Sequence, residues 1–219
     1  MPDDDLVTQL ETAAGLQLLR GWKDAGQFDR LLEVACSPSF NYGARYFAIG
    51  HLAAFPSSDV IGALTGLLAD PEMRVRQRAA KSLAEIGASA QVAVPTLMNA
   101  VFDGEGAVRV AATRALGRIG DPSALPALER AADTTSWDTL HAWVTDSLVK
   151  LGSPEAARHL TARLSAEKRW QRRWAARELA SLGGPDAIGP LRAARARDRL
   201  HGRVYTKAIR TIERRSARA

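Results

Sequence analysis

The sequence has a single cysteine, Cys36, so it cannot form the disulfide framework typical of small secreted domains. No apolar run approaches the roughly 18 residues that a membrane-spanning helix needs. The first ten residues, "MPDDDLVTQL", are acidic where a secretory signal would be basic. These absences predict a cytoplasmic protein with no membrane span.

Motifs that would indicate catalysis, a cofactor or a metal are also missing. The chain has no Cys-x-x-Cys or His-Glu-x-x-His pair, no Gly-x-Gly-x-x-Gly and no P-loop. Its four histidines are scattered, and the leading "DDD" has the character of a solvated end. We therefore expect no cofactor, no metal site and no catalytic residues, which favours a protein that is not an enzyme.

Charge is distributed unevenly along the chain. Residues 1–152 carry 13 Lys and Arg against 18 Asp and Glu, a net charge of −5, whereas residues 153–219 carry 17 against 6, a net charge of +11. A basic final third beside an acidic remainder predicts a directional electrostatic surface that attracts an acidic partner. The alternative explanation is a codon bias that favours Arg over Lys.

Signals for β-strands are almost absent, and strong helix formers dominate. Four glycines, Gly87, Gly120, Gly152 and Gly183, follow one another at intervals of 33, 32 and 31 residues. Each closes an apolar-periodic stretch and is followed by a short turn rich in Asp, Ser, Pro or Gly. Glycine just past a helix end favours a left-handed cap, so the pattern predicts repeated helical hairpins.

Six hairpins account for most of the chain. They cover Phe28–Phe55, Val60–Gly87, Val94–Gly120, Ala124–Gly152, Ala156–Gly183 and Ala187–Arg214. Residues 1–27 are expected to form one N-terminal capping helix, continuous with a single repeat domain over residues 28–219. One hairpin cannot bury its own apolar face, but a stack of hairpins can.

The pattern D-P-x-x-x-V-R-x-x-A-A-x-x-L-x-x-I-G is strongest at Asp70–Gly87 and Asp103–Gly120. It resembles the HEAT repeat, in particular the short bacterial form found in relatives of phycobilisome lyases. The resemblance implies an all-α, right-handed α-solenoid whose second helices line a concave face. It also implies that Asp and Arg pair within each repeat, Asp70 with Arg76 and Asp103 with Arg109. We expect a monomer.

Aligning the second helices places basic and aromatic residues on that concave face. The predicted binding residues are Lys81, Arg114, Trp143, Arg173, Trp174, Arg177, Arg203 and Lys207. Solvation of exposed helix positions is the default for such Arg and Lys side chains. For Trp143 and Trp174, packing between repeats and binding of a partner are two alternatives that the sequence supports equally.

Two further segments are similar to HEAT-like alkylpurine DNA glycosylases. In "TTSWDTLHAW", Trp137 matches that family's tryptophan, and in "KRWQRRWAA", Arg173 matches its arginine. The resemblance implies that Trp137 and His141 contact a base or its loop. However, His141 stands where the family has an aspartate, and a histidine cannot replace the carboxylate that stabilises the developing positive charge.

The interpretation that these patterns favour is a non-enzymatic helical-repeat scaffold. Its partner is expected to be a protein that lays an acidic segment along the basic face. The alternative is a DNA-binding protein of the alkylpurine glycosylase type, supported by the basic C-terminal third and the interleaved aromatics. A lyase-like role on a pigment follows only from the repeat subfamily, and nothing in the sequence marks a pigment pocket.

Overall fold

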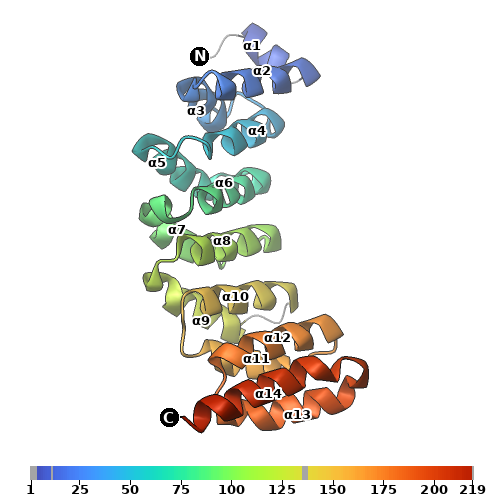
Figure 1. The fold of residues 1–219 in the computed structure, drawn as a ribbon. Helices are drawn as coiled ribbons and strands as arrows, with labels where there is room; N and C mark the ends of the chain where they lie inside the picture. Colours follow the sequence, from blue (N-terminus) through green and yellow to red (C-terminus); the bar gives the residue numbers. More distant parts are fainter. Residues whose placement is uncertain (1–3, 11, 135–137, 219) are drawn as a thin grey trace. The chain divides into compact units, whose positions relative to one another are not determined.

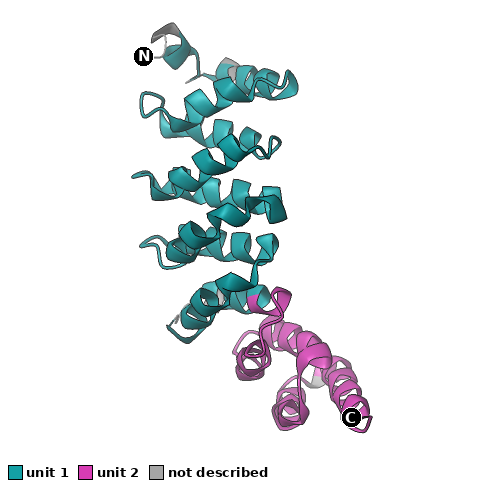
Figure 2. Ribbon diagram, turned by 90° about the vertical axis from the view of Figure 1, so that its left-hand side faces the viewer, with its two compact units in different colours: residues 1–147 teal, residues 148–219 magenta. Residues whose placement is uncertain are grey.

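The computed structural model describes residues 4–10, 12–134 and 138–218, and within them every regular element is helical. The prediction of an all-α repeat fold is confirmed (Figure 1). The chain divides into two compact units, Met1–Ser147 and Leu148–Ala219, shown separately coloured in Figure 2. That the whole chain forms a single continuous domain stays a prediction.

Unit 1 begins with two short helices and continues with helical hairpins. Its helices are α1 (Asp4–Leu10), α2 (Ala13–Asp24), α3 (Phe28–Cys36), α4 (Tyr42–Leu52), α5 (Ser58–Gly66), α6 (Met73–Ile86), α7 (Val94–Ala100), α8 (Gly106–Ile119), α9 (Leu125–Thr134) and α10 (Asp138–Lys150), the last of which crosses into unit 2. Within each hairpin the two helices pack together, α3 on α4, α5 on α6 and α7 on α8. The first helices form one layer of the stack and the second helices form the other, as Figure 1 shows.

Contacts between second helices hold the stack of unit 1 together. Helices α2, α4, α6 and α8 touch in sequence. At the α4–α6 contact, the buried Ser82 hydroxyl donates to the Ile49 carbonyl over 2.9 Å. An equivalent bond joins α8 and α10, where the Ser147 hydroxyl donates to the Thr113 carbonyl, also over 2.9 Å. Buried small residues on these helices, such as Ala48, Ala79 and Ala112, allow them to approach closely.

The expectation of one capping helix before residue 28 is wrong, because two helices form there. Thr12 separates them: its hydroxyl donates to the Gln9 carbonyl over 2.7 Å and accepts from the Gly15 amide over 3.3 Å. Threonine at this position therefore ends α1 and is the N-cap of α2.

The expectation of a left-handed glycine cap is confirmed at Gly120, where φ is 81° and ψ is 17°, whereas Gly87 combines a positive φ with a ψ of −136°. Gly87, Gly120 and Gly152 have positive φ, at 71°, 81° and 70°. Gly183 instead has an extended backbone with φ −68°. Its role is close approach, because a Cβ atom there would lie 2.7 Å from the Leu179 carbonyl oxygen.

The Asp–Arg pairing within each repeat is also wrong in detail. Within its own repeat, Arg76 donates to the backbone carbonyls of Asp70 over 2.8 Å and Pro71 over 3.1 Å. Its carboxylate partner is Asp103 of the next repeat, with Nε 2.9 Å from Oδ2. Arg45 likewise pairs with Asp70 at 2.5 Å. Each carboxylate therefore pairs with an arginine of the preceding repeat. Its Oδ1 atom also accepts a hydrogen bond from the backbone amide two residues later, that of Glu72 or Glu105.

These bridges perturb the ionisation of Asp103. Burial alone would raise the pKa of this carboxyl, but hydrogen bonds from Arg76 and from the Glu105 amide outweigh it and lower the pKa below its ordinary value. The bridge raises the pKa of Arg76. The pair is therefore fully charged at neutral pH and links consecutive repeats.

Unit 2 contains four further helices, α11 (Ala156–Arg163), α12 (Arg169–Leu182), α13 (Ile188–Arg197) and α14 (Gly202–Ser216). They form two hairpins, α11 with α12 and α13 with α14, joined by contact of the second helices α12 and α14. Their core is centred on Leu179, Leu191 and Tyr205, all 0% exposed. The Tyr205 hydroxyl donates to the buried Asp198 carboxylate over 3.2 Å.

Candidate functional site

Three of the predicted binding residues, Lys81, Arg114 and Trp143, lie in unit 1. The structure brings two of them together, because the exposed Arg114 guanidinium carbon lies 4.4 Å from the centre of the half-buried Trp143 ring. Lys81 is half-buried. A cation over the face of a tryptophan ring is attracted to it, so this contact holds the Arg114 guanidinium against the Trp143 ring.

The other predicted residues of the basic face lie in unit 2. Trp174 is half-buried and packs against the core of that unit, which favours its packing role. Arg173 is also half-buried, and its Nε atom is buried without a hydrogen-bond partner. Arg177, Arg203 and Lys207 are exposed. A role in binding for these residues stays a prediction.

Of the two residues expected to contact a base or its loop, the structure describes His141. Trp137 lies outside the described residues. His141 is on α10, at the position that Arg109 occupies on α8, 32 residues earlier. Its carbonyl accepts from the Thr145 hydroxyl over 2.8 Å, and that hydroxyl lies 3.5 Å from its ring Nδ1 atom. His141 therefore stands in the column of the structural arginines.

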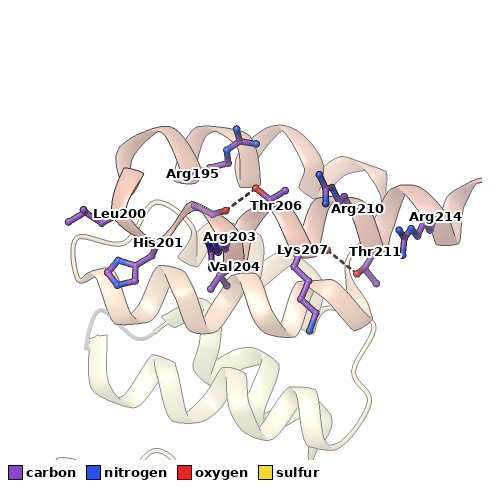
Figure 3. A pocket seen from close by; sticks show the side chains of 11 residues that line it. Arg195, Leu200, His201, Arg203, Val204, Thr206, Lys207, Arg210, Thr211 and Arg214 are labelled. Carbon is purple, nitrogen blue, oxygen red and sulfur yellow. Dashed lines mark hydrogen bonds between the residues drawn. The ribbon is translucent and has the colours of Figure 1, made fainter.

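An open groove of about 920 Å³ runs along α14 of unit 2. Figure 3 shows its lining side chains, which come from α14, from the end of α13 and from the turn between them. Five of them are cationic, namely Arg195, Arg203, Lys207, Arg210 and Arg214, and no carboxylate lines the groove. The lining of the groove is therefore strongly positive.

Four of these cations form one row, which we call the α14 stripe: Arg203, Lys207, Arg210 and Arg214. They are four, three and four residues apart, the spacing that places side chains on one face of a helix. At 1.5 Å per residue the stripe is about 16 Å long. All four side chains are exposed, and no carboxylate among the described residues pairs with any of them.

Burial on the opposite face of α14 fixes this orientation. Tyr205, Ala208, Ile209 and Ile212 are buried against the rest of unit 2, so the stripe must face solvent. Like charges at this spacing destabilise a helix by about 0.2–0.5 kcal/mol per pair. The stripe therefore carries unfavourable repulsion between its own side chains, which nearby anions reduce.

Other arginines nearby have structural partners, which separates them from the stripe. Arg215 caps the end of α12 by donating to the carbonyls of Ala180, Ser181 and Gly183. Arg192 lies 3.3 Å from the Glu213 carboxylate. The residues of the α14 stripe therefore differ from these arginines because no carboxylate of the described residues pairs with them.

Sequence reasoning found Arg203 and Lys207 but missed Arg195, Arg210 and Arg214. The predicted face was built from columns shared by all repeats. Arg210 aligns with Gly117 of the third hairpin and Arg214 lies beyond its closing glycine, so neither belongs to a charged column. The helical period of four, three and four residues within α14 itself is the signal that identifies them.

Comparison with known families agrees with this architecture. A sequence profile described as HEAT repeats matches residues 28–101 and 88–149, and one described as PBS lyase HEAT-like repeat matches residues 171–196. The HEAT-repeat matches alone cover more than half of the chain. The chain belongs to the HEAT-repeat family.

Solved structures similar to this HEAT-repeat protein share its fold. Escherichia coli YibA has a TM-score of 0.64 at 17% identity, over 98% of this chain and 93% of that chain. The complex of CpcE and CpcF of phycocyanin lyase from Nostoc sp. PCC7120 has a TM-score of 0.55 at 17% identity, over 95% and 92%. A designed armadillo repeat protein has a TM-score of 0.56 at 16% identity, over 84% and 98%.

At these identities the likeness concerns the fold alone. No curated protein sequence matches this HEAT-repeat chain at a significant level. Across residues 4–10, 12–134 and 138–218, no helix is long and apolar enough to cross a bilayer. Within the same ranges, His, Cys, Asp and Glu side chains nowhere gather in a group that could hold a metal ion.

Proposed function

We propose that this HEAT-repeat protein is a non-enzymatic scaffold that binds an acidic segment of a partner protein along the groove of unit 2. The observation that carries the proposal is the α14 stripe, four exposed cations in a groove that no carboxylate lines. Helical-repeat proteins commonly use an extended surface of this kind to bind partners. Arg173, Trp174 and Arg177 of the same unit are proposed as further contacts, and Lys81, Arg114 and Trp143 are proposed as binding residues within unit 1.

The spacing of the stripe suits a chain of carboxylates. Side chains four or three residues apart on a helix are about 5–6 Å apart. Alternate side chains of an extended peptide are about 6.6 Å apart and point to the same side. A segment with Glu or Asp at alternate positions therefore presents its carboxylates at nearly the same intervals, and arginine binds each one in a charge-assisted fork.

Binding of a labelled acidic peptide tests the proposal directly. The probe is a fluorescein-labelled peptide that alternates Glu and Ser, and the readout is fluorescence anisotropy with the full chain. Changing all four residues of the α14 stripe to Gln is expected to weaken binding about 100-fold, because four charge pairs are lost. The matched control removes four exposed arginines of unit 1 by the same change, at Arg20, Arg30, Arg118 and Arg130.

The control protein has the same net charge as the stripe variant and is expected to bind like the unaltered chain. Equal weakening in both variants would contradict the proposal, because net charge and not the groove would then explain binding. Binding of duplex DNA in preference to the peptide would favour the DNA-binding alternative. Release of a methylated purine that is lost with Arg173→Ala would establish the glycosylase activity.

A further inference from the structure

Unit 1 carries a second surface whose chemistry differs from that of the basic groove. Two adjoining hollows of about 410 and 480 Å³ share the residues Tyr42, Gly43 and Phe47 of α4. The first continues over the end of α1, the start of α2 and the start of α4, where it is lined by Leu10, Thr12, Leu16, Asn41 and Ala44. The second continues over α4, α6 and α8, where it is lined by Tyr46, Met73, Arg74, Gln77 and Ala107.

The wall shared by the two hollows is aromatic and unusually open. Tyr42 is 48% exposed and Phe47 is 44% exposed, and Leu16 in the first hollow is 38% exposed. Large apolar side chains that gather on one surface of a repeat protein indicate a binding surface. Exposed aromatics are the residues that contribute most to protein interfaces.

One cation stands at this wall, and the residues that line the two hollows include no carboxylate. The Arg74 guanidinium carbon lies 4.9 Å from the centre of the Tyr42 ring, and Nη1 donates to the Tyr42 hydroxyl over 3.1 Å. Stacking of this kind holds the guanidinium in place while Arg74 itself remains exposed. Since a guanidinium carries five N–H donors, others are available for a carboxylate.

Sequence-local features hold this surface open. Asn41 is the N-cap of α4, accepting from the Ala44 amide over 2.9 Å, and so fixes where Tyr42 begins the helix. Gly43 places no side chain between the two hollows. Packed helices are about 8–10 Å apart, so the row α2, α4, α6 and α8 spans about 25 Å. That length fits about seven or eight residues of extended peptide.

We propose that these two hollows form one docking site, the aromatic site, for an extended segment of a partner protein that carries a carboxylate between two large apolar side chains. The apolar side chains occupy the hollows on either side of Tyr42 and Phe47, and the carboxylate pairs with Arg74. Alternate residues of an extended chain point to the same side about 6.6 Å apart, so all three side chains face the site. This site lies within unit 1 and does not depend on the basic groove.

The test uses a fluorescein-labelled peptide with the sequence Leu-Ser-Glu-Ser-Leu between Gly-Ser pairs, titrated with the full chain. Tyr42→Ala and Phe47→Ala are each expected to weaken binding at least about fivefold. Phe102→Ala is the matched control, because Phe102 is 39% exposed and also stacks under an arginine, with the Arg130 guanidinium carbon 4.1 Å from its ring centre. Phe102 lines neither hollow, so binding is expected to be unchanged.

Two further measurements define the chemistry of the site. Replacing the Glu of the peptide by Gln is expected to weaken binding to the unaltered chain but not to Arg74→Gln. The stripe variant of unit 2 is expected to bind this peptide normally, so failure here and failure of the proposed function are separable. The proposal is overturned if the unaltered chain does not bind at about 1 mM, or if Phe102→Ala weakens binding as much as Tyr42→Ala. Self-association abolished by Tyr42→Ala in sedimentation would also overturn it, because the occupant would then be a second copy of the chain.

Discussion

The two units of this HEAT-repeat protein use charge in opposite ways. Unit 1 carries 12 Lys and Arg against 18 Asp and Glu, a net charge of −6, whereas unit 2 carries 18 against 6, a net charge of +12. In unit 1, the Arg76–Asp103 and Arg45–Asp70 pairs bridge consecutive repeats. In unit 2, arginines of the α14 stripe have no carboxylate partner among the described residues.

A single column of the repeat shows how this difference arises. Arg172 of α12 donates to the carbonyls of the residues six and five positions before it, as Arg76 and Arg109 do. Six residues before Arg172, however, stands Ala166, where the other two repeats have Asp. The charge pairs that link consecutive repeats in unit 1 therefore have no counterpart at the Arg172 position of unit 2.

The largest expected effect on stability is the loss of a bridge. Arg76→Ala is expected to lower the free energy of unfolding by about 3 kcal/mol, because it leaves the partly buried Asp103 carboxylate without its partner. Hydrogen exchange should show the loss of protection in α6 and α8 and not in unit 2. Arg172→Ala is the matched control and should cost less, and an equal loss would contradict the contrast between the units.

A tight contact in unit 1 gives the next largest effect. Gly117→Ala is expected to cost about 2 kcal/mol, because a Cβ atom there would lie 2.5 Å from the Ser147 hydroxyl oxygen. Gly62→Ala in α5 is the control, because nothing lies within 4 Å of its Cβ position. Alanine at that open helical site should stabilise the chain by up to about 1 kcal/mol. Urea denaturation measures both changes.

Acid should weaken unit 1 through its bridges. The pKa of Asp103 is lower in the folded chain than its unfolded value of about 3.9, so its contribution is present above that pH and is lost as the pH falls through the folded pKa. Asp103→Asn removes this dependence. At pH about 7 the unaltered chain is expected to have a larger free energy of unfolding than Asp103→Asn, and this difference between the two proteins should narrow near pH about 3. A difference that does not change with pH would contradict the assignment.

The smallest effect concerns the stripe itself. Arg210→Gln relieves repulsion with Lys207 and Arg214 and is expected to stabilise α14 by about 0.5 kcal/mol at low salt. Added salt should erase the gain because it screens exposed charges. Thermal unfolding followed by circular dichroism measures the change, and a loss of stability would mean that Arg210 has a structural role.

The repeat pattern predicted most of the fold because it depends on local chemistry. The glycine spacing and the apolar columns located the six hairpins. Two features depended on distances that spacing does not reveal. The side-chain hydrogen bonds of Thr12 divide the N-terminal segment into two helices. The Asp103 carboxylate pairs with Arg76 of the preceding repeat, whereas the sequence pattern predicted a partner within its own repeat.

The candidate site was predicted less completely. Arg203 and Lys207 were found because they continue columns of the other hairpins, whereas Arg210 and Arg214 belong to α14 alone. Tyr42 and Arg74 of the aromatic site lie at the starts of α4 and α6, before the aligned columns begin. Which exposed cations lack partners is a property of tertiary contacts, and those depend on residues far apart in the sequence.

The most direct test of the account is the salt dependence of acidic-peptide binding by the unaltered chain and the stripe variant. Between about 0.1 M and 1 M NaCl the Debye length falls from about 10 Å to 3 Å. Binding of the Glu-Ser peptide to the unaltered chain is predicted to weaken steeply over this range, and the stripe variant should show weak binding with little salt dependence. The same salt dependence in both proteins would contradict the assignment of binding to the α14 stripe.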